Sequence, residues 1–136
     1  NPILMREFIL FLFIALWLSA CGNSSSGPAD SDLAAQTAKV YYDQLLNGDY
    51  GSFVAGRYQP TELPASYREQ LIVNARMFIE QQEKEHKGIK SVSVAGGVAD
   101  TTRHMADAFL IFTYGDGTKE QVVVPMVSVK SVWYMR

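Results

Sequence analysis

The sequence predicts an α+β domain in which N-terminal helices pack on one face of an antiparallel sheet. Before Gly88, apolar side chains recur at the spacing of helical turns, and after it the apolar period changes to two, as in strands. The run Gly115-Asp116-Gly117 adds a hairpin signal between two of these strands. Helices followed by a meander of strands indicate the α+β class rather than alternating units.

The first two helices are predicted from the residues at their ends. Helix one is expected from about residue 32 to 47, with Ser31 and Asp32 at its N-terminus and Gly48 as its left-handed stop. Directly after that stop, Asp49 is placed to cap a short second helix.

A long third helix is expected between the proline-containing loop at residues 56–63 and Gly88. Ser66 and Glu69 have the spacing of a capping box at its start. Its predicted buried stripe consists of Tyr67, Leu71, Ala75, Phe78 and Ile79.

Four strands follow the helices. They are expected over residues 89–98, 103–114, 119–129 and 132–135. The second strand is apolar on both faces, with Phe109 and Ile111 on one side and Leu110 and Phe112 on the other. Because only one face can cover the helices, we expect the other to form a homodimer through the sheet.

The segment before residue 22 has the pattern of a leader. Phe8 to Leu18 is an unbroken apolar run, shorter than the ~20 residues that a transmembrane helix needs. Met5-Arg6 before it predicts a translation start with a short positive region, so that Asn1 to Leu4 would be an upstream extension. We therefore expect residues 1–21 to be a signal peptide.

The end of that apolar run contains the single cysteine of the chain. Leu18-Ser19-Ala20-Cys21 resembles the lipobox of bacterial lipoproteins, which implies a diacylglycerol on the Cys21 thiol and cleavage just before it. The alternative is a buried cysteine or half of a disulfide, but Cys21 has no partner in the chain. Lipidation is the interpretation that we favour.

Residues 22–32 are small and polar, which is the composition of a flexible tether, and residues 33–136 are left as the folded domain. The protein is therefore expected at the bacterial cell envelope, lipid-anchored at the outer membrane and facing the periplasm or the surface. Nucleic acid is excluded as a partner, because 12 Lys and Arg against 14 Asp and Glu form no basic cluster.

Several short motifs, together with the order of the elements, carry a family resemblance over nearly all of residues 33–136. These motifs are Tyr42, Leu45, Asn47-Gly48-Asp49-Tyr50, Phe53, Gly88-Ile89, Tyr114-Gly115-Asp116-Gly117 and Val132-Trp133-Tyr134. They resemble the small NTF2-like (cystatin-like α+β) lipoproteins of Bacteroidetes, domains of unknown function. The resemblance implies N-terminal helices packed on a curved antiparallel sheet of about four strands, with a pocket at the open end of the cone.

This chain departs from the family at one point. The family has an Asp-Gly or Asn-Gly turn before the last tryptophan, where this chain has Lys130-Ser131. Members of the wider superfamily include isomerases, hydratases and transport factors, so the fold alone does not assign a function.

No metal or other cofactor is expected. His86 and His104 are the only histidines, and they fall in different elements without a nearby cysteine or a ligand-spaced pair of carboxylates. No nucleophile elbow is present either.

Asp107 is the one candidate catalytic residue. It shares a strand face with Met105 and Phe109, and the resemblance implies that an acid on the sheet could work as a general base beside tyrosine hydroxyls. The possible donors are Tyr41, Tyr42, Tyr58 and Tyr114. The competing interpretation, which we favour, is an acid near a strand end or sheet edge that blunts pairing with other chains.

Tyr42, Tyr58 and Trp133 rank first among the aromatic residues that could line a ligand pocket. The alternative is that these aromatic side chains fill the core. The sequence favours a non-enzymatic envelope module that binds a small apolar ligand or a partner protein. The alternative is an enzyme like ketosteroid isomerase, or of the SnoaL-like type, with Asp107 as general base.

Overall fold

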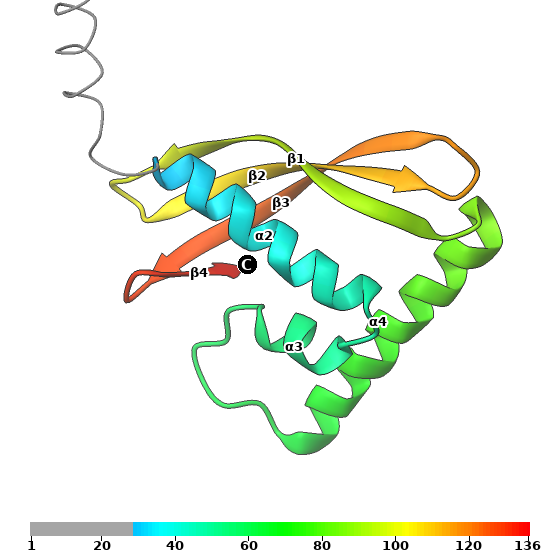
Figure 1. Cartoon of the computed structure of the whole chain (residues 1–136). Coiled ribbons are helices and arrows are strands. Elements are labelled where there is room, and N and C mark those ends of the chain that lie inside the picture. Colours follow the sequence, from blue (N-terminus) through cyan, green and yellow to red (C-terminus); the bar gives the residue numbers. More distant parts are fainter. Residues whose placement is uncertain (1–28) are drawn as a thin grey trace, which may run out of the picture.

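The computed structural model describes residues 29–136, so the predicted signal peptide and most of the predicted tether lie outside the described residues. The elements within that range are α2 (Asp30–Leu46), α3 (Tyr50–Ala55), α4 (Ala65–His86), β1 (Ile89–Asp100), β2 (Met105–Tyr114), β3 (Lys119–Val129) and β4 (Val132–Met135). The strands form an antiparallel sheet in the order β1-β2-β3-β4, and α2 lies across one of its faces (Figure 1). The α+β prediction is confirmed.

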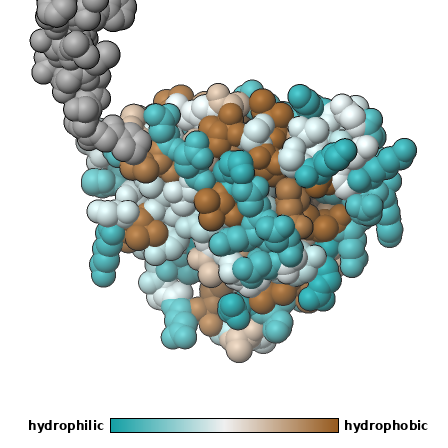
Figure 2. Space-filling model, in the orientation of Figure 1, coloured by the Kyte–Doolittle hydropathy of each residue, from teal (hydrophilic) through white to brown (hydrophobic). Residues whose placement is uncertain are grey.

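None of the helices within residues 29–136 combines the length and the apolar character that crossing a membrane requires. On the face of the molecule that carries α2, hydrophobic residues reach the surface in separate patches between hydrophilic ones (Figure 2).

Alanines on both sides let α2 lie close to the middle of the sheet. Ala34, Ala35 and Ala38 of α2 are at most 1% exposed, and they belong to one buried cluster with Ala106 and Ala108 of β2. A larger side chain at this contact would force the helix away from the strand, since well-packed interiors have no spare volume.

The N-terminal end of α2 approaches β1 equally closely. A Cβ atom on Gly97 would lie 2.7 Å from the carbonyl oxygen of Ser31, so only glycine fits here. A register shift between Val94 and Gly96 precedes this contact, and such a bulge bends a strand.

The remaining core comes from alternate residues of the strands. On β2 the residues that face α2 are buried, and those between them, including Asp107, are only half-buried. The other large core side chains are Leu110, Phe112, Tyr114, Met126, Trp133 and Met135. The period of two in the sequence therefore predicted the correct pair of faces.

The predicted start of the first helix is wrong by two residues. α2 begins at Asp30 with Ala29 at the N-cap position, and no side chain caps it. Asp30 and Asp32 instead occupy the first turn, where acidic side chains interact favourably with the helix dipole.

The capping box predicted from Ser66 and Glu69 is also absent. Pro64 is the N-cap residue of α4, and no side chain accepts a hydrogen bond there. Ser66 is therefore already inside the helix, too far along for its hydroxyl to cap the first turn. In contrast, Asp49 caps α3 as predicted, accepting a hydrogen bond from the Ser52 amide at 3.2 Å.

The turn between β3 and β4 places two residues in a backbone conformation that is unfavourable for them. Val129 pairs with Val132, so Lys130 and Ser131 form a two-residue hairpin loop, with φ of 51° and 65°. Positive φ at both positions is the geometry for which Asn-Gly is the preferred sequence. The register is therefore that of a two-residue hairpin loop, although its two residues are not those that such a loop favours.

Replacing this loop by the double change Lys130→Asn and Ser131→Gly should stabilise the protein by about 1 kcal/mol, because the positive-φ strain disappears. Chemical denaturation of both proteins measures the gain. Ser91→Gly, at an extended position of β1, is the control and should destabilise. An unchanged or lower free energy of unfolding in the double variant would contradict the strained turn.

Candidate functional site

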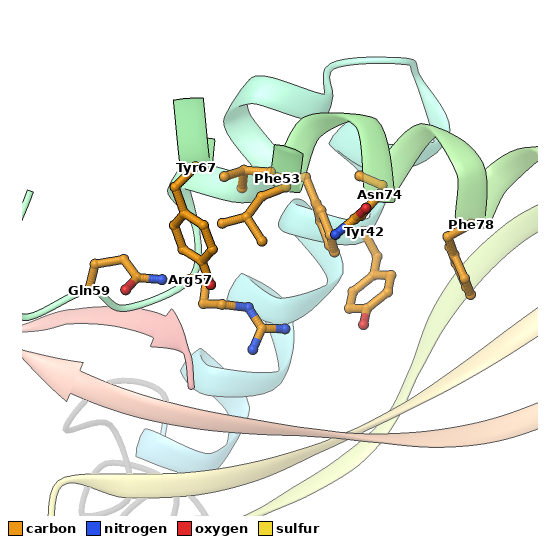
Figure 3. Close-up of a pocket in the computed structure, with 10 residues that line it drawn as sticks. Tyr42, Phe53, Arg57, Gln59, Tyr67, Asn74 and Phe78 are labelled. Carbon is orange, nitrogen blue, oxygen red and sulfur yellow. The ribbon is translucent and has the colours of Figure 1, made fainter. Parts of the chain in front are cut away.

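The candidate site is a cavity of about 390 Å³ between α4 and the pair α2 and α3 (Figure 3). Its walls are mainly apolar, and two tyrosines contribute hydroxyl groups. The lining residues are Tyr42, Phe53, Val54, Arg57, Gln59, Tyr67, Leu71, Asn74, Ala75 and Phe78. Arg57, Gln59 and Asn74 supply the polar groups that are not hydroxyls.

The cavity exists because α4 stands beside α2 and α3 rather than across the sheet (Figure 1). Ala75 is the one residue of α4 that is buried, and Leu71 and Phe78 are half-buried. Tyr67 is 51% exposed, which corrects the prediction that it belongs to a buried stripe. The apolar stripe of α4 lines a cavity over part of its length, since α2 already covers the sheet.

Tyr42 projects from α2 into this cavity. Its ring packs edge-on against Phe53 at 5.2 Å and obliquely against Phe112 at 5.4 Å, measured between ring centroids. Burial raises the pKa of Tyr42, and the nearby positive charge of Arg57 partly opposes that rise. The hydroxyl group is therefore protonated at neutral pH and can donate a hydrogen bond.

Arg57 is positioned by backbone pairing with the last strand. The Tyr58 amide donates to the Met135 carbonyl at 2.7 Å, and the Met135 amide donates to the Gly56 carbonyl at 2.8 Å. Arg57 forms a parallel bridge with Met135 between these two bonds. The backbone of this arginine is thus part of the sheet edge, although its sequence context is a loop.

The same junction requires a glycine at position 56. A Cβ atom there would lie 2.5 Å from the ring of Tyr41. The Tyr41 hydroxyl donates to the Trp133 carbonyl at 2.6 Å, which ties α2 to β4 beside the bridge. Burial, with a smaller contribution from Tyr134, raises the pKa of Tyr41.

The three aromatic residues predicted for a pocket lie in three different places. Tyr42 lines the cavity, whereas Tyr58 lines a neighbouring open hollow of about 710 Å³. Trp133 is 9% exposed and belongs to the core, because it and Met135 face α2 while Tyr134 between them faces the other way. The structure therefore brings only Tyr42 of the three to this cavity.

Asp107 lies on the face of β2 opposite to α2, where it is half-buried. Its strand neighbours are Val98 on β1 and Pro125 on β3, so β2 is paired on both edges at this position. The interpretation that Asp107 protects a free sheet edge is therefore wrong, although the residue is near the start of its strand. It lines a shallow hollow of about 220 Å³ together with Arg103 and Arg136.

The two histidines are far apart in the fold. His86 stacks on Tyr114 at 4.2 Å and its Nδ1 lies 3.3 Å from a carboxylate oxygen of Asp116, while His104 is in the β1–β2 turn. Burial and a hydrogen bond to Glu120 raise the pKa of Tyr114 to about 12. Among residues 29–136, no three His, Cys, Asp or Glu side chains gather as a metal site would require.

Sequence reasoning did not find Arg57, Gln59 or Asn74. Arg57 and Gln59 are in the loop after α3, and Asn74 is an amide that follows the apolar run at residues 71–73 of α4. The amide at position 74, one turn from Leu71 and Phe78, was the signal that could have marked the cavity face of this helix.

The solved structures that resemble this chain include the following two. A Campylobacter jejuni protein assigned as an NTF2-like transpeptidase aligns with a TM-score of 0.57 and 11% identity, over 72% of this chain and 92% of that one. Aln2 from a Streptomyces species aligns with a TM-score of 0.45 and 16% identity, over 74% of this chain and 81% of that one. No protein-family model matches the sequence, and no curated protein does.

The similarity to the Campylobacter jejuni structure, together with the helices on a four-stranded antiparallel sheet, defines an NTF2-like α+β fold. The fold that the sequence resemblance implied is therefore confirmed. At 11% identity the similarity extends to the fold alone.

Proposed function

We propose that this chain is a lipid-anchored protein of the bacterial cell envelope whose domain binds a small, mainly apolar ligand without transforming it. The observation that carries the proposal is the cavity of about 390 Å³ between α4 and the pair α2 and α3. Small-molecule sites occupy roughly 300–1,000 Å³ and combine apolar walls with a few polar groups. A ligand here would gain roughly 25 cal/mol for each Å² of apolar surface that it buries.

The ketosteroid-isomerase-like alternative needs a carboxylate beside the bound ligand. The residues that line the cavity include no Asp or Glu, and Asp107 is on the opposite face of the sheet. A general base must come within hydrogen-bond reach of the proton that it removes. Binding without turnover is therefore the function that we favour for this cavity.

The proposed anchor is a lipid on Cys21. Its support is the sequence alone: the apolar run, the small residues Ser19 and Ala20, and the flexible composition that follows. Two or three acyl chains hold a protein stably on a membrane, whereas one chain binds only marginally.

We further propose that two copies associate through the outer face of the sheet, which is the face opposite to α2. Its apolar residues include Val98, Met105, Phe109, Ile111, Val123, Pro125 and Val127. Val98 on β1 and Val123 on β3 are 62% and 54% exposed, so large apolar side chains of this face are open to solvent. Asp107 and the neighbouring Arg103 and Arg136 add charges of both signs, which can pair across a two-fold axis.

Filling the cavity should abolish binding. Ala75→Phe places a ring in the space, so we expect the affinity for 2-naphthamide, a neutral aromatic probe, to fall at least ~10-fold. Calorimetry with the full chain in nanodiscs measures it, with empty nanodiscs as blank and a melting curve to check folding. Ala95→Phe, at an exposed position of β1, should bind like wild type. A wild type that fails to bind, or equal binding by Ala75→Phe, would refute the cavity as the site.

Cys21→Ser should remove the lipid, because the hydroxyl does not form the thioether. Cells fed an alkyne-tagged fatty acid should label the wild type and a Ser19→Ala control, which keeps a small residue at that position, but not Cys21→Ser. Label on Cys21→Ser would show that the lipid is attached elsewhere.

Val123→Lys should convert the dimer to a monomer, because it places a charge in the centre of the apolar outer face. Light scattering of the detergent-solubilised chain measures the mass. Val73→Lys, at a position of α4 that is 38% exposed, is the control and should remain dimeric. A monomeric wild type at high concentration would count against the interface.

A further inference from the structure

We infer that the occupant of the cavity is an apolar anion: a molecule with an aromatic or aliphatic body and one negatively charged group held by Arg57. This inference rests on the proposed ligand-binding function and adds the chemical class of the ligand.

Arg57 provides the only formal charge among the ten residues that line the cavity (Figure 3). Within residues 29–136, the ion pairs involve Lys39, His86 and Arg103 as the basic partners, and none involves Arg57. The guanidinium group is therefore available to a ligand from outside the described chain.

The backbone of Arg57 is fixed before any ligand arrives. Two backbone hydrogen bonds on either side of it hold it at the sheet edge. The Tyr58 amide donates to the Met135 carbonyl, and the Met135 amide donates to the Gly56 carbonyl. The Arg57 side chain extends from that edge toward the end of the cavity where Tyr42 lies (Figure 3). A guanidinium group presented from a fixed backbone loses less freedom when it binds, which favours affinity.

Tyr42 supplies a second donor at the same end. Figure 3 shows the Arg57 side chain extending toward the side of the cavity into which the Tyr42 phenol projects. Burial raises the pKa of Tyr42 and so keeps its hydroxyl protonated. A carboxylate, sulfonate or phosphate can accept from a guanidinium and a hydroxyl group together. A cationic or purely hydrocarbon ligand uses neither donor.

Desolvation decides between an anionic and a neutral ligand. Arg57 is exposed to solvent, so its charge is hydrated. A neutral ligand that filled the cavity would remove part of that water and replace it at most with hydrogen bonds to an uncharged acceptor, which compensate the charge less well. An anionic group replaces the water with charge-assisted hydrogen bonds, for which the planar guanidinium is well suited.

The charged residues around the cavity also favour a negatively charged ligand. Arg57 also lines the neighbouring hollow, together with Arg68 and Lys130 as further cations and Glu62 as the single acid. Three positive charges against one negative charge produce a local field that attracts anions.

Two matched probes test the charge. 2-Naphthoate and 2-naphthamide have the same aromatic body, and only the first is an anion. With the full chain in nanodiscs, calorimetry should give a Kd for 2-naphthoate ~10-fold lower than that for 2-naphthamide, as expected for a hydrogen bond to a charged group. 2-Naphthalenesulfonate then compares a second anionic group. Arg57→Gln should remove the preference by weakening only the anions, while Lys90→Gln, an equal change in net charge at an exposed site, should keep it.

The possible results separate this inference from the function on which it rests. Equal binding of the two probes by wild type, or a preference that survives Arg57→Gln, would refute an anionic ligand held by Arg57. The proposal that the cavity binds a ligand would remain. Loss of 2-naphthamide binding in Arg57→Gln as well would mean that Arg57 only maintains the wall, which also overturns the anion. If wild type binds neither probe, the proposed binding function itself fails.

Discussion

The close contact between α2 and the middle of the sheet is the constraint on which the other features depend. Ala38 and Ala108 are both fully buried, so the helix lies close to the middle of the sheet with no larger side chain at that contact. At this distance Tyr41 reaches the Trp133 carbonyl, and Tyr42 on the next position projects sideways. Because α2 covers this face of the sheet, α4 packs beside α2 and α3 instead. The space between these helices is the cavity that a ligand could fill.

The elements that could be predicted are those set by residues a few positions apart. Gly48 and Asp49 stop one helix and start the next within a single turn, and the strands follow from alternation alone. The starts of α2 and α4 were missed because several nearby residues can each begin a helix. In α4 the N-cap residue is Pro64, whose φ is fixed, and not Ser66. The Lys130-Ser131 turn was not predictable from propensity, because strand pairing imposes a conformation that neither residue prefers.

The site was less predictable than the fold. Tyr42 and Phe53 could be named because an aromatic residue at helical spacing is either core or pocket wall, but the polar lining residues could not be. Arg57 reaches the cavity through its pairing with Met135, and no local pattern connects two residues at opposite ends of the domain. Trp133 and Tyr134 illustrate the same difficulty. They are neighbours on β4, but Trp133 is in the core and Tyr134 is on the outer face.

The bridge between Arg57 and Met135 also governs the order in which this domain can assemble. Each helix, and each hairpin of the sheet, forms from residues near one another in sequence, but the bridge closes a loop that contains α4, β1, β2 and β3. Contacts of such long sequence separation form late, because they carry the largest loop-closure entropy. A chain that is synthesised N-terminus first can therefore fix the backbone of Arg57 only after β4, its last strand, has emerged.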